Sequence, residues 1–404
     1  MKTDPDQLAV CGGEPAFAEP LHVGRPNLGD RGKLLARIND LLDRRWLTND
    51  GPYLREFERR LADLAGVRHC LAVSNATVGL EIAIRALGLA GEVILPSFTF
   101  IATAHALRWQ GLTPVFADID PRTHNLDPAR VEVLITPRTT AVIGVHLWGR
   151  PCEVEALGEI AGRRGLRLIF DAAHALGCSR RGRTVGGFGD AEVFSFHATK
   201  FCNSFEGGAV ATDDDALAAR IGLMRNFGFA GYDQVVELGT NGKMSEVAAA
   251  MGLTSLEGMD EFIAANRRHH GQYREELRAL PGVEVLTYDE AERNNYQYLV
   301  VEVDEARAGI GRDQLVRVLW AENVIARRYF YPGCHRQEPY RTLDPGAGCR
   351  LPVTERVSAR VLLLPTGTAV GPGEVAAVCG IIRTAVAHAP TLRERLSGAV
   401  KSCL

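Results

Sequence analysis

Lysine is scarce in this chain. Of 46 basic residues only five are lysines, namely Lys2, Lys33, Lys200, Lys243 and Lys401. Arginine serves wherever positive charge alone is needed, so a retained lysine indicates a use for its amine. A lysine amine, unlike a guanidinium, can lose its proton and act as a nucleophile or base. Lys200 is the candidate because of its neighbours, although a snorkelling lysine at the end of a strand is the alternative.

Long apolar runs and blocks of like charge are also missing. No apolar stretch approaches the ~20 residues of a membrane span, and residues 1–10 contain Asp4 and Asp6 but no hydrophobic signal core. The net charge is −3, and the charges are mixed along the chain. These features argue against a membrane protein, a secreted protein and a nucleic-acid-binding surface.

Paired cysteines and a dinucleotide fingerprint are absent too. The nine cysteines are scattered without a Cys-x-x-Cys pair, so we expect reduced thiols in a cytoplasmic protein and no zinc site. The pair His269-His270 follows Arg267 and Arg268 in a polar helical stretch, and we expect it at the solvated surface. Residues 186–189 are glycine-rich, but a strand follows and no helix opens from them, so they predict a turn and not a dehydrogenase loop.

Length and periodicity predict a large α/β domain. A chain of 404 residues, 46% of them hydrophobic, is expected to form about two domains. A helix is predicted over residues 54–66 from its apolar spacing. Strands then alternate with helices, which predicts a mainly parallel, seven-stranded sheet covered on both faces. The predicted strands are Cys70–Val73, Glu92–Leu95, Pro114–Ile119, Thr140–Val145, Arg167–Phe170, Ala191–Phe196 and Gly208–Thr212, with helices Val78–Leu87, Ile101–Trp109 and Val154–Arg164.

The pattern changes after about residue 245. A helical stretch from Ser245 to Leu280 comes first, and further elements are predicted at Tyr298–Val303, Arg312–Asn323 and Gly373–Ala387. We therefore divide the chain into a large domain, residues 1–258, and a smaller α+β domain, residues 259–404.

Polar and small residues gather at the ends of the predicted strands. Ser74 to Val78 join a strand to a helix, and free amides at a helix start can form a phosphate cup, although an ordinary helix cap is the commoner use. Asp171 ends an apolar strand at the edge where α/β sheets bind ligands, unless it merely caps a following helix. Ser195 ends the strand before Lys200, and Phe100 offers an aromatic face, unless it is a core residue.

A phosphate cup, an acid, a flat aromatic ring and a lysine amine match the needs of one cofactor. Pyridoxal phosphate requires a lysine for its Schiff base, an acid facing its ring nitrogen and a site for its phosphate. The acid keeps that nitrogen protonated, so the ring can accept electrons from a carbanion. The sequence thus predicts a pyridoxal-phosphate site around Lys200.

The chain resembles the DegT-type sugar aminotransferases, which have the aspartate-aminotransferase-like fold type I. The resemblance runs from Arg25-Pro26-Asn27 to Leu362–Pro365 and rests on an ordered set of segments. These are residues 46–52, 74–77 and 96–100, Asp171-Ala172-Ala173-His174, Ser195–Lys200, Glu206-Gly207-Gly208, Asn241–Glu246 and Tyr329-Phe330-Tyr331-Pro332.

The resemblance implies a role for each matching position. Lys200 forms the Schiff base and Asp171 faces the ring nitrogen; both are the expected catalytic residues. Phe100 stacks on the ring, and Ala76, Thr77 and Ser195 hold the phosphate. Asn241 reaches the phosphate of the other subunit, which implies a homodimer with shared sites. Lys243 is a substrate or phosphate contact, unless it is a surface lysine.

One position departs from the commoner family pattern. His174 stands where many members carry glutamine, beside the ring oxygen of the cofactor, and histidine can still donate a hydrogen bond there. Tyr331 and His335 are candidate sugar contacts, with core residues as the alternative.

The resemblance also suggests a substrate. It is nearest to enzymes that transfer the amine of L-glutamate to C4 of a dTDP-linked 4-keto-6-deoxyhexose. C3 amination, a ketocyclitol substrate and a non-catalytic sensor remain alternatives. A dehydratase branch carries histidine in place of the lysine, so Lys200 favours transamination.

Overall fold

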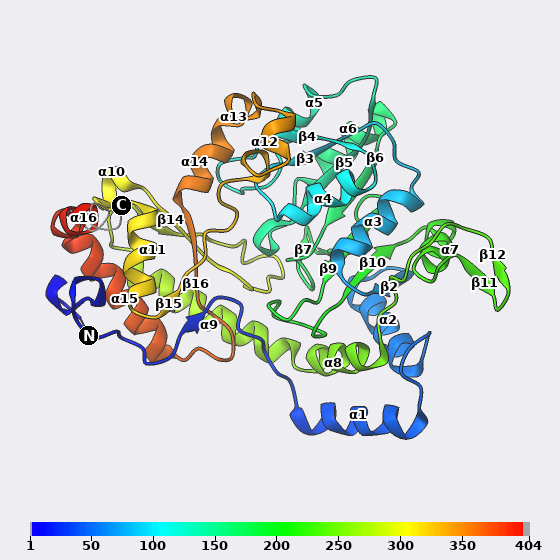
Figure 1. Cartoon of the computed structure of the whole chain (residues 1–404), viewed down its shortest axis with the longest axis horizontal. Coiled ribbons are helices and arrows are strands. Elements are labelled where there is room, and N and C mark those ends of the chain that lie inside the picture. The colour runs from blue at the N-terminus through cyan, green and yellow to red at the C-terminus, as the bar shows by residue number, and fades with distance from the viewer. Residues whose placement is uncertain (1, 399–404) are drawn as a thin grey trace.

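A seven-stranded sheet forms the centre of the computed structural model, which describes residues 2–398 (Figure 1). Its strand order is β2-β10-β9-β6-β5-β3-β4. Of these strands only β10 runs antiparallel to its neighbours, which confirms the mainly parallel sheet. The bounds are β2 (His69–Val73), β3 (Glu92–Pro96), β4 (Thr113–Ala117), β5 (Thr139–Val145), β6 (Arg167–Asp171), β9 (Ala191–Ser195) and β10 (Gly208–Thr212).

Helices bury both faces of this sheet. Successive strand residues point to opposite faces: Val193 packs in one hydrophobic cluster and Phe194 in another. The first cluster joins the sheet to α3 (Ala76–Ala86), α4 (Ile101–Trp109) and α7 (Asp215–Met224). The opposite face packs against α2 (Pro52–Ala65), α5 (Pro128–Glu132), α6 (Val154–Arg164) and α8 (Glu246–Glu257). Burial on both faces explains why these strands lack polar alternation.

A second core surrounds the antiparallel sheet β13-β14-β16. The strands are β13 (Val283–Val285), β14 (Leu299–Val303) and β16 (Val361–Leu364). The surrounding helices are α9 (Met259–Leu277), α10 (Glu305–Ala308), α11 (Arg312–Ala321), α14 (Pro352–Arg360), α15 (Pro372–Ala387) and α16 (Ala389–Gly398). The short helices α12 (Tyr340–Leu343) and α13 (Ala347–Arg350) lie beside α14 (Figure 1).

The N-terminal segment packs on this second core. Leu8 and Leu21 are buried in it, and β1 (Leu21–His22) pairs with β15 (Val324–Ile325). The short helices η1 (Pro5–Gln7) and η2 (Ala9–Cys11) precede β1. We keep residue 258 as the proposed domain boundary, because Gly258 separates α8 from α9, and propose that residues 2–22 belong with the small domain.

Two elements project from the large domain. Helix α1 (Arg31–Arg44) lies along α8, and the hairpin β11 (Phe229–Gly231) to β12 (Gln234–Val235) extends away from the sheet (Figure 1). Both expose large apolar side chains, among them Leu35, Leu42 and Tyr232. The remaining short elements are β7 (Ser179–Arg180), β8 (Arg183–Thr184), η3 (Leu147–Gly149) and η4 (Cys334–Arg336).

The structure corrects two expectations about residues 245–280. The single helical stretch is two helices, which break at Gly258. The expectation that His269 and His270 are solvated was wrong, because both are buried. His269 Nδ1 lies 3.2 Å from Thr366 Oγ1, and His270 Nε2 lies 2.9 Å from the Leu286 carbonyl oxygen. Burial lowers the pKa of both rings.

Within residues 2–398 no single helix is both long and apolar enough to cross a membrane. Helices α15 and α16 satisfy both conditions only as a pair, bent by 86°. Eight cysteines fall in the same part of the chain and all are free, six of them buried. The ninth, Cys403, lies outside the described residues.

Candidate active site

A cavity of about 660 Å³ lies at the carboxyl ends of the central strands. Parallel strands meet at this edge, so residues far apart in sequence share one site. Seven of the predicted site residues line the cavity: Ala76, Thr77, Phe100, Asp171, His174, Ser195 and Lys200.

Lys200 follows β9 in a tight turn, in which its backbone N–H donates to the His197 carbonyl at 2.8 Å. The side chain extends to Tyr298, whose hydroxyl oxygen lies 3.3 Å from Nζ. Burial lowers the pKa of Lys200 to about 8, although the negative charge of Asp171 opposes this shift. A substantial fraction of the amine is therefore neutral and nucleophilic near pH 8.

Asp171 is the last residue of β6 and is buried. Thr103 donates its hydroxyl hydrogen to Oδ2 at 2.8 Å, and the Ala173 backbone N–H donates to Oδ1 at 3.1 Å. No helix follows β6 directly, so Asp171 does not cap one. Burial raises the pKa of Asp171 and the Thr103 hydrogen bond opposes that rise. The fixed carboxyl group can pair with a protonated ring nitrogen.

The start of α3 forms one end of the cavity. Asn75 caps the helix by accepting the Val78 N–H at 2.9 Å, while the first N–H groups of a helix lack partners within it. Gly208 passes so close that an added Cβ would lie 2.6 Å from the Ala76 nitrogen. A side chain at 208 would fill this space, so the glycine keeps the helix terminus open to an anion such as phosphate.

His174 stacks against Phe330, which also lines the cavity, and against the buried ring of Trp148. Its plane is 10° from that of Phe330 and 16° from that of Trp148. Nδ1 accepts the Trp148 backbone N–H at 3.3 Å, which assigns the proton of the neutral ring to Nε2. Burial holds the pKa of His174 well below its ordinary value, so His174 is a neutral hydrogen-bond donor.

Four predicted residues lie outside this cavity. Asn241 is exposed, and its side chain accepts a hydrogen bond from Lys243 Nζ at 2.7 Å. Lys243 also lies over the Phe227 ring, 4.5 Å from its centre. Tyr331 lines a neighbouring cavity.

His335 is buried and lines neither cavity. Its Nδ1 lies 2.6 Å from Ser97 Oγ and its Nε2 lies 2.7 Å from Glu355 Oε1. Both ring nitrogens thus contact other side chains of the protein, which favours the alternative that His335 is a core residue over its prediction as a sugar contact.

Asn27 joins the segment that follows Lys200 to the loop at Thr368. Its side-chain amide donates to the Phe201 carbonyl at 2.9 Å, and its carbonyl oxygen accepts both the backbone N–H and the hydroxyl of Thr368. Asn203 donates to the Asn27 backbone oxygen at 2.9 Å. This buried residue therefore holds three chain segments together behind Lys200.

Sequence reasoning missed three residues of the cavity region. Thr103 lies in the first turn of α4, directly after the predicted motif at residues 96–100, and that position could have identified it. Tyr298 and Arg327 also line the cavity, but they lie far from Lys200 in the sequence and no local pattern connects them with it.

Comparison with known proteins agrees with this geometry. Residues 30–383 match the model of the DegT/DnrJ/EryC1/StrS aminotransferase family. The chain is 38% identical over 347 residues to a dTDP-4-amino-4,6-dideoxy-D-glucose transaminase from Shigella dysenteriae, covering 86% of this chain and 94% of the relative. It is also 38% identical to a GDP-perosamine synthase from Caulobacter vibrioides, over 81% of this chain and 89% of that one.

Solved structures give the same result. The crystal structure of DesI in the presence of its TDP-sugar product is 55% identical, has a TM-score of 0.90, and covers 98% of this chain and 99% of its own. DesV from S. venezuelae in complex with a ketimine intermediate is 31% identical, with a TM-score of 0.83 and coverage of 88% and 95%.

The residues around the cavity fit the cofactor that this family uses, since a nucleophilic lysine, a buried acid and an open helix terminus face one space. The fold type I prediction is confirmed. The chain therefore belongs to the DegT/DnrJ/EryC1/StrS aminotransferase family and is a pyridoxal-phosphate-dependent sugar aminotransferase.

Proposed function

We propose that this enzyme transfers the amino group of L-glutamate to C4 of dTDP-4-keto-6-deoxy-D-glucose, giving dTDP-4-amino-4,6-dideoxy-D-glucose. The observation that carries the proposal is the cavity in which Lys200 and Asp171 lie together, in a chain 38% identical to a transaminase named for that product. The intact lysine favours amine transfer over the dehydratase alternative.

Bound pyridoxal phosphate supplies an aldehyde that exchanges amines and a ring that accepts electrons. In the proposed reaction Lys200 Nζ would hold the cofactor at rest and, as a free amine, would move a proton at the reacting carbon. Asp171 keeps the ring nitrogen protonated. The α3 terminus with Thr77 and Ser195 would bind the phosphate, and the His174 Nε2–H would donate to the ring oxygen. The same residues act in reverse on the ketosugar.

We also propose that two copies form a cytoplasmic homodimer with shared sites. Asn241 is exposed and lies outside its own cavity, which supports a role in the site of a partner. The exposed apolar side chains of α1 and of the β11–β12 hairpin offer surface for such an association.

Product analysis tests the reaction directly. The enzyme is incubated with dTDP-4-keto-6-deoxy-D-glucose and L-glutamate, and the product is examined by NMR. We expect an amine at C4, equimolar with 2-oxoglutarate, and proton couplings that define its orientation. An amine at C3, or turnover only with a ketocyclitol or with glutamine, contradicts the proposal.

A further inference from the structure

A second cavity, of about 540 Å³, adjoins the one that contains Lys200. The two share Thr99, Phe100, Arg327, Tyr329 and Phe330 in their walls. The proposed reaction uses only the first cavity, so the second is left without a role.

Positive charge dominates this second cavity. Arg327 and Arg328 line it, and no carboxylate does. Arg328 donates to Asp313 at 2.9 Å, whereas Arg327 pairs with no carboxylate within residues 2–398. The Arg327 guanidinium lies 5.2 Å from the centre of the Tyr329 ring, at the junction of the two cavities. An exposed, unpaired guanidinium there is suited to bidentate binding of phosphate oxygens.

An aromatic side chain stands beyond the arginines. Trp320 lines the cavity and remains 46% exposed. Its indole N–H donates to the Ala326 carbonyl at 2.8 Å, which fixes the orientation of the ring. A fixed, half-exposed indole is a stacking face for a planar base.

We infer that the second cavity holds the nucleoside diphosphate of the substrate, with Arg327 binding the diphosphate and Trp320 stacking on the base. The inference rests on the proposed function. In a nucleotide sugar the diphosphate lies between sugar and nucleoside, and Arg327 likewise lies between the cavity of Lys200 and that of Trp320.

Calorimetric titration of the cofactor-loaded enzyme with dTDP tests this assignment. We expect Arg327→Gln to weaken dTDP binding by about tenfold or more, and Trp320→Ala by about tenfold, with Trp320→Phe largely restoring it. We expect pyrophosphate binding to be lost in Arg327→Gln and to be kept in the two Trp320 variants. The matched controls are Arg122→Gln and Trp109→Ala, which change highly exposed side chains outside both cavities and leave dTDP binding unchanged.

The glutamate half-reaction, followed by cofactor absorbance, separates the alternatives. We expect the control variants Arg122→Gln and Trp109→Ala to leave the rate of this half-reaction unchanged. Unaltered dTDP binding in both Arg327→Gln and Trp320→Ala overturns the inference. A slowed glutamate half-reaction in Arg327→Gln with normal dTDP binding also overturns it, because that result would assign Arg327 to the amino donor. A wild-type enzyme that reacts with glutamate but does not bind dTDP refutes the inference alone. Binding of dTDP that depends on both residues, without amination of the 4-ketosugar, supports the inference and refutes the proposed reaction.

Discussion

A lysine must lose its proton before it can attack an aldehyde, and the surroundings of Lys200 favour that loss. Burial, opposed by Asp171, lowers its pKa from 10.5 to about 8. At pH 8 about half of the Lys200 side chains carry a free amine, compared with roughly one in 300 for a lysine at its reference pKa.

Reconstitution of the cofactor-free enzyme should therefore depend on pH. We expect the rate of pyridoxal phosphate capture, measured by stopped-flow absorbance, to rise with pH and to level off above about 8, because the neutral amine is the nucleophile. Lys200→Arg should show no covalent capture and lose ~10³-fold or more of turnover. A capture rate that still rises steeply near pH 10 would contradict a lowered pKa.

The proposed hydrogen bond from His174 to the cofactor can also be tested. His174→Gln should keep a hydrogen-bond donor and change cofactor affinity only slightly. His174→Phe keeps a ring facing Phe330 but removes the donor, so affinity should fall about tenfold. Fluorescence titration of the cofactor-free variants measures both. Equal affinity in the two variants would exclude the proposed hydrogen bond.

The roles of Ala76, Thr77, Phe100 and His174 came from the family resemblance. Residue types at strand ends were enough to indicate Asp171, Ser195 and Lys200, because chemistry and position coincide there. They were not enough for Tyr298, which contacts Lys200 from 98 positions away. His335 also could not be placed, since its burial depends on Ser97 and Glu355, which are remote in sequence.

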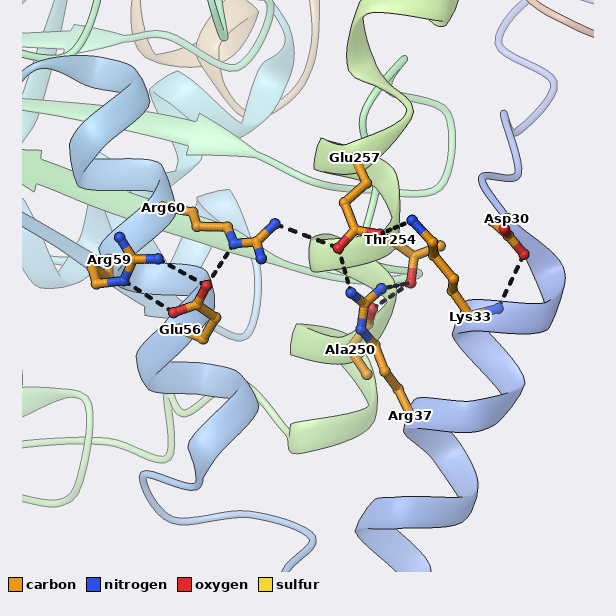
Figure 2. Close-up of polar contacts among 9 residues, drawn as sticks. All are labelled: Asp30, Lys33, Arg37, Glu56, Arg59, Arg60, Ala250, Thr254 and Glu257. Carbon is orange, nitrogen blue, oxygen red and sulfur yellow. Dashed lines mark hydrogen bonds and ion pairs between the residues drawn. The ribbon is translucent and has the colours of Figure 1, made fainter.

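Among the elements, α1 depends on a few polar contacts with its neighbour. Figure 2 shows Lys33 and Arg37 of α1, together with Arg60 of α2, converging on Glu257 at the end of α8. Arg37 also donates to Thr254 at 2.6 Å. Glu257 therefore links α1 to α8 and α2 through ion pairs.

Glu257→Gln should loosen α1. We expect local stability to fall by about 1 kcal/mol, or about fivefold in local opening, since the network is partly exposed. Hydrogen exchange of amides in residues 31–44 measures this, and the effect should shrink in 1 M salt. Glu159→Gln, on the exposed side of α6, is the control. Equal exchange in both variants would show that α1 is held by other contacts.

The helices whose bounds could be predicted from the sequence are those with a clear hydrophobic pattern. Helices α4 and α6 have the predicted bounds, because buried helices between buried strands leave clear boundaries. Helix α1 was not predicted, since it buries only Leu41. The break at Gly258 was missed because apolar spacing continues through it.

The proposed shared site of the homodimer can be tested by mixing inactive variants. Lys200→Ala and Asn241→Ala homodimers are combined and allowed to exchange subunits. If Asn241 acts in the site of the partner, each heterodimer contains one intact site, and activity should recover to about a quarter of wild type. Lys200→Ala mixed with Asp171→Asn is the control and should recover nothing, because both defects affect residues of the same chain's cavity. No recovery in the first mixture would place Asn241 outside the partner's site.

The pairing of β1 with β15 has a consequence for synthesis. Leu21 hydrogen-bonds in register beside Val324, which the ribosome adds only in the last fifth of the chain. The opening segment must therefore wait, unpaired, while the large sheet is translated and folds. This parallel pair therefore forms late in synthesis, so nascent chains stalled before residue 324 should carry a protease-sensitive N-terminal segment.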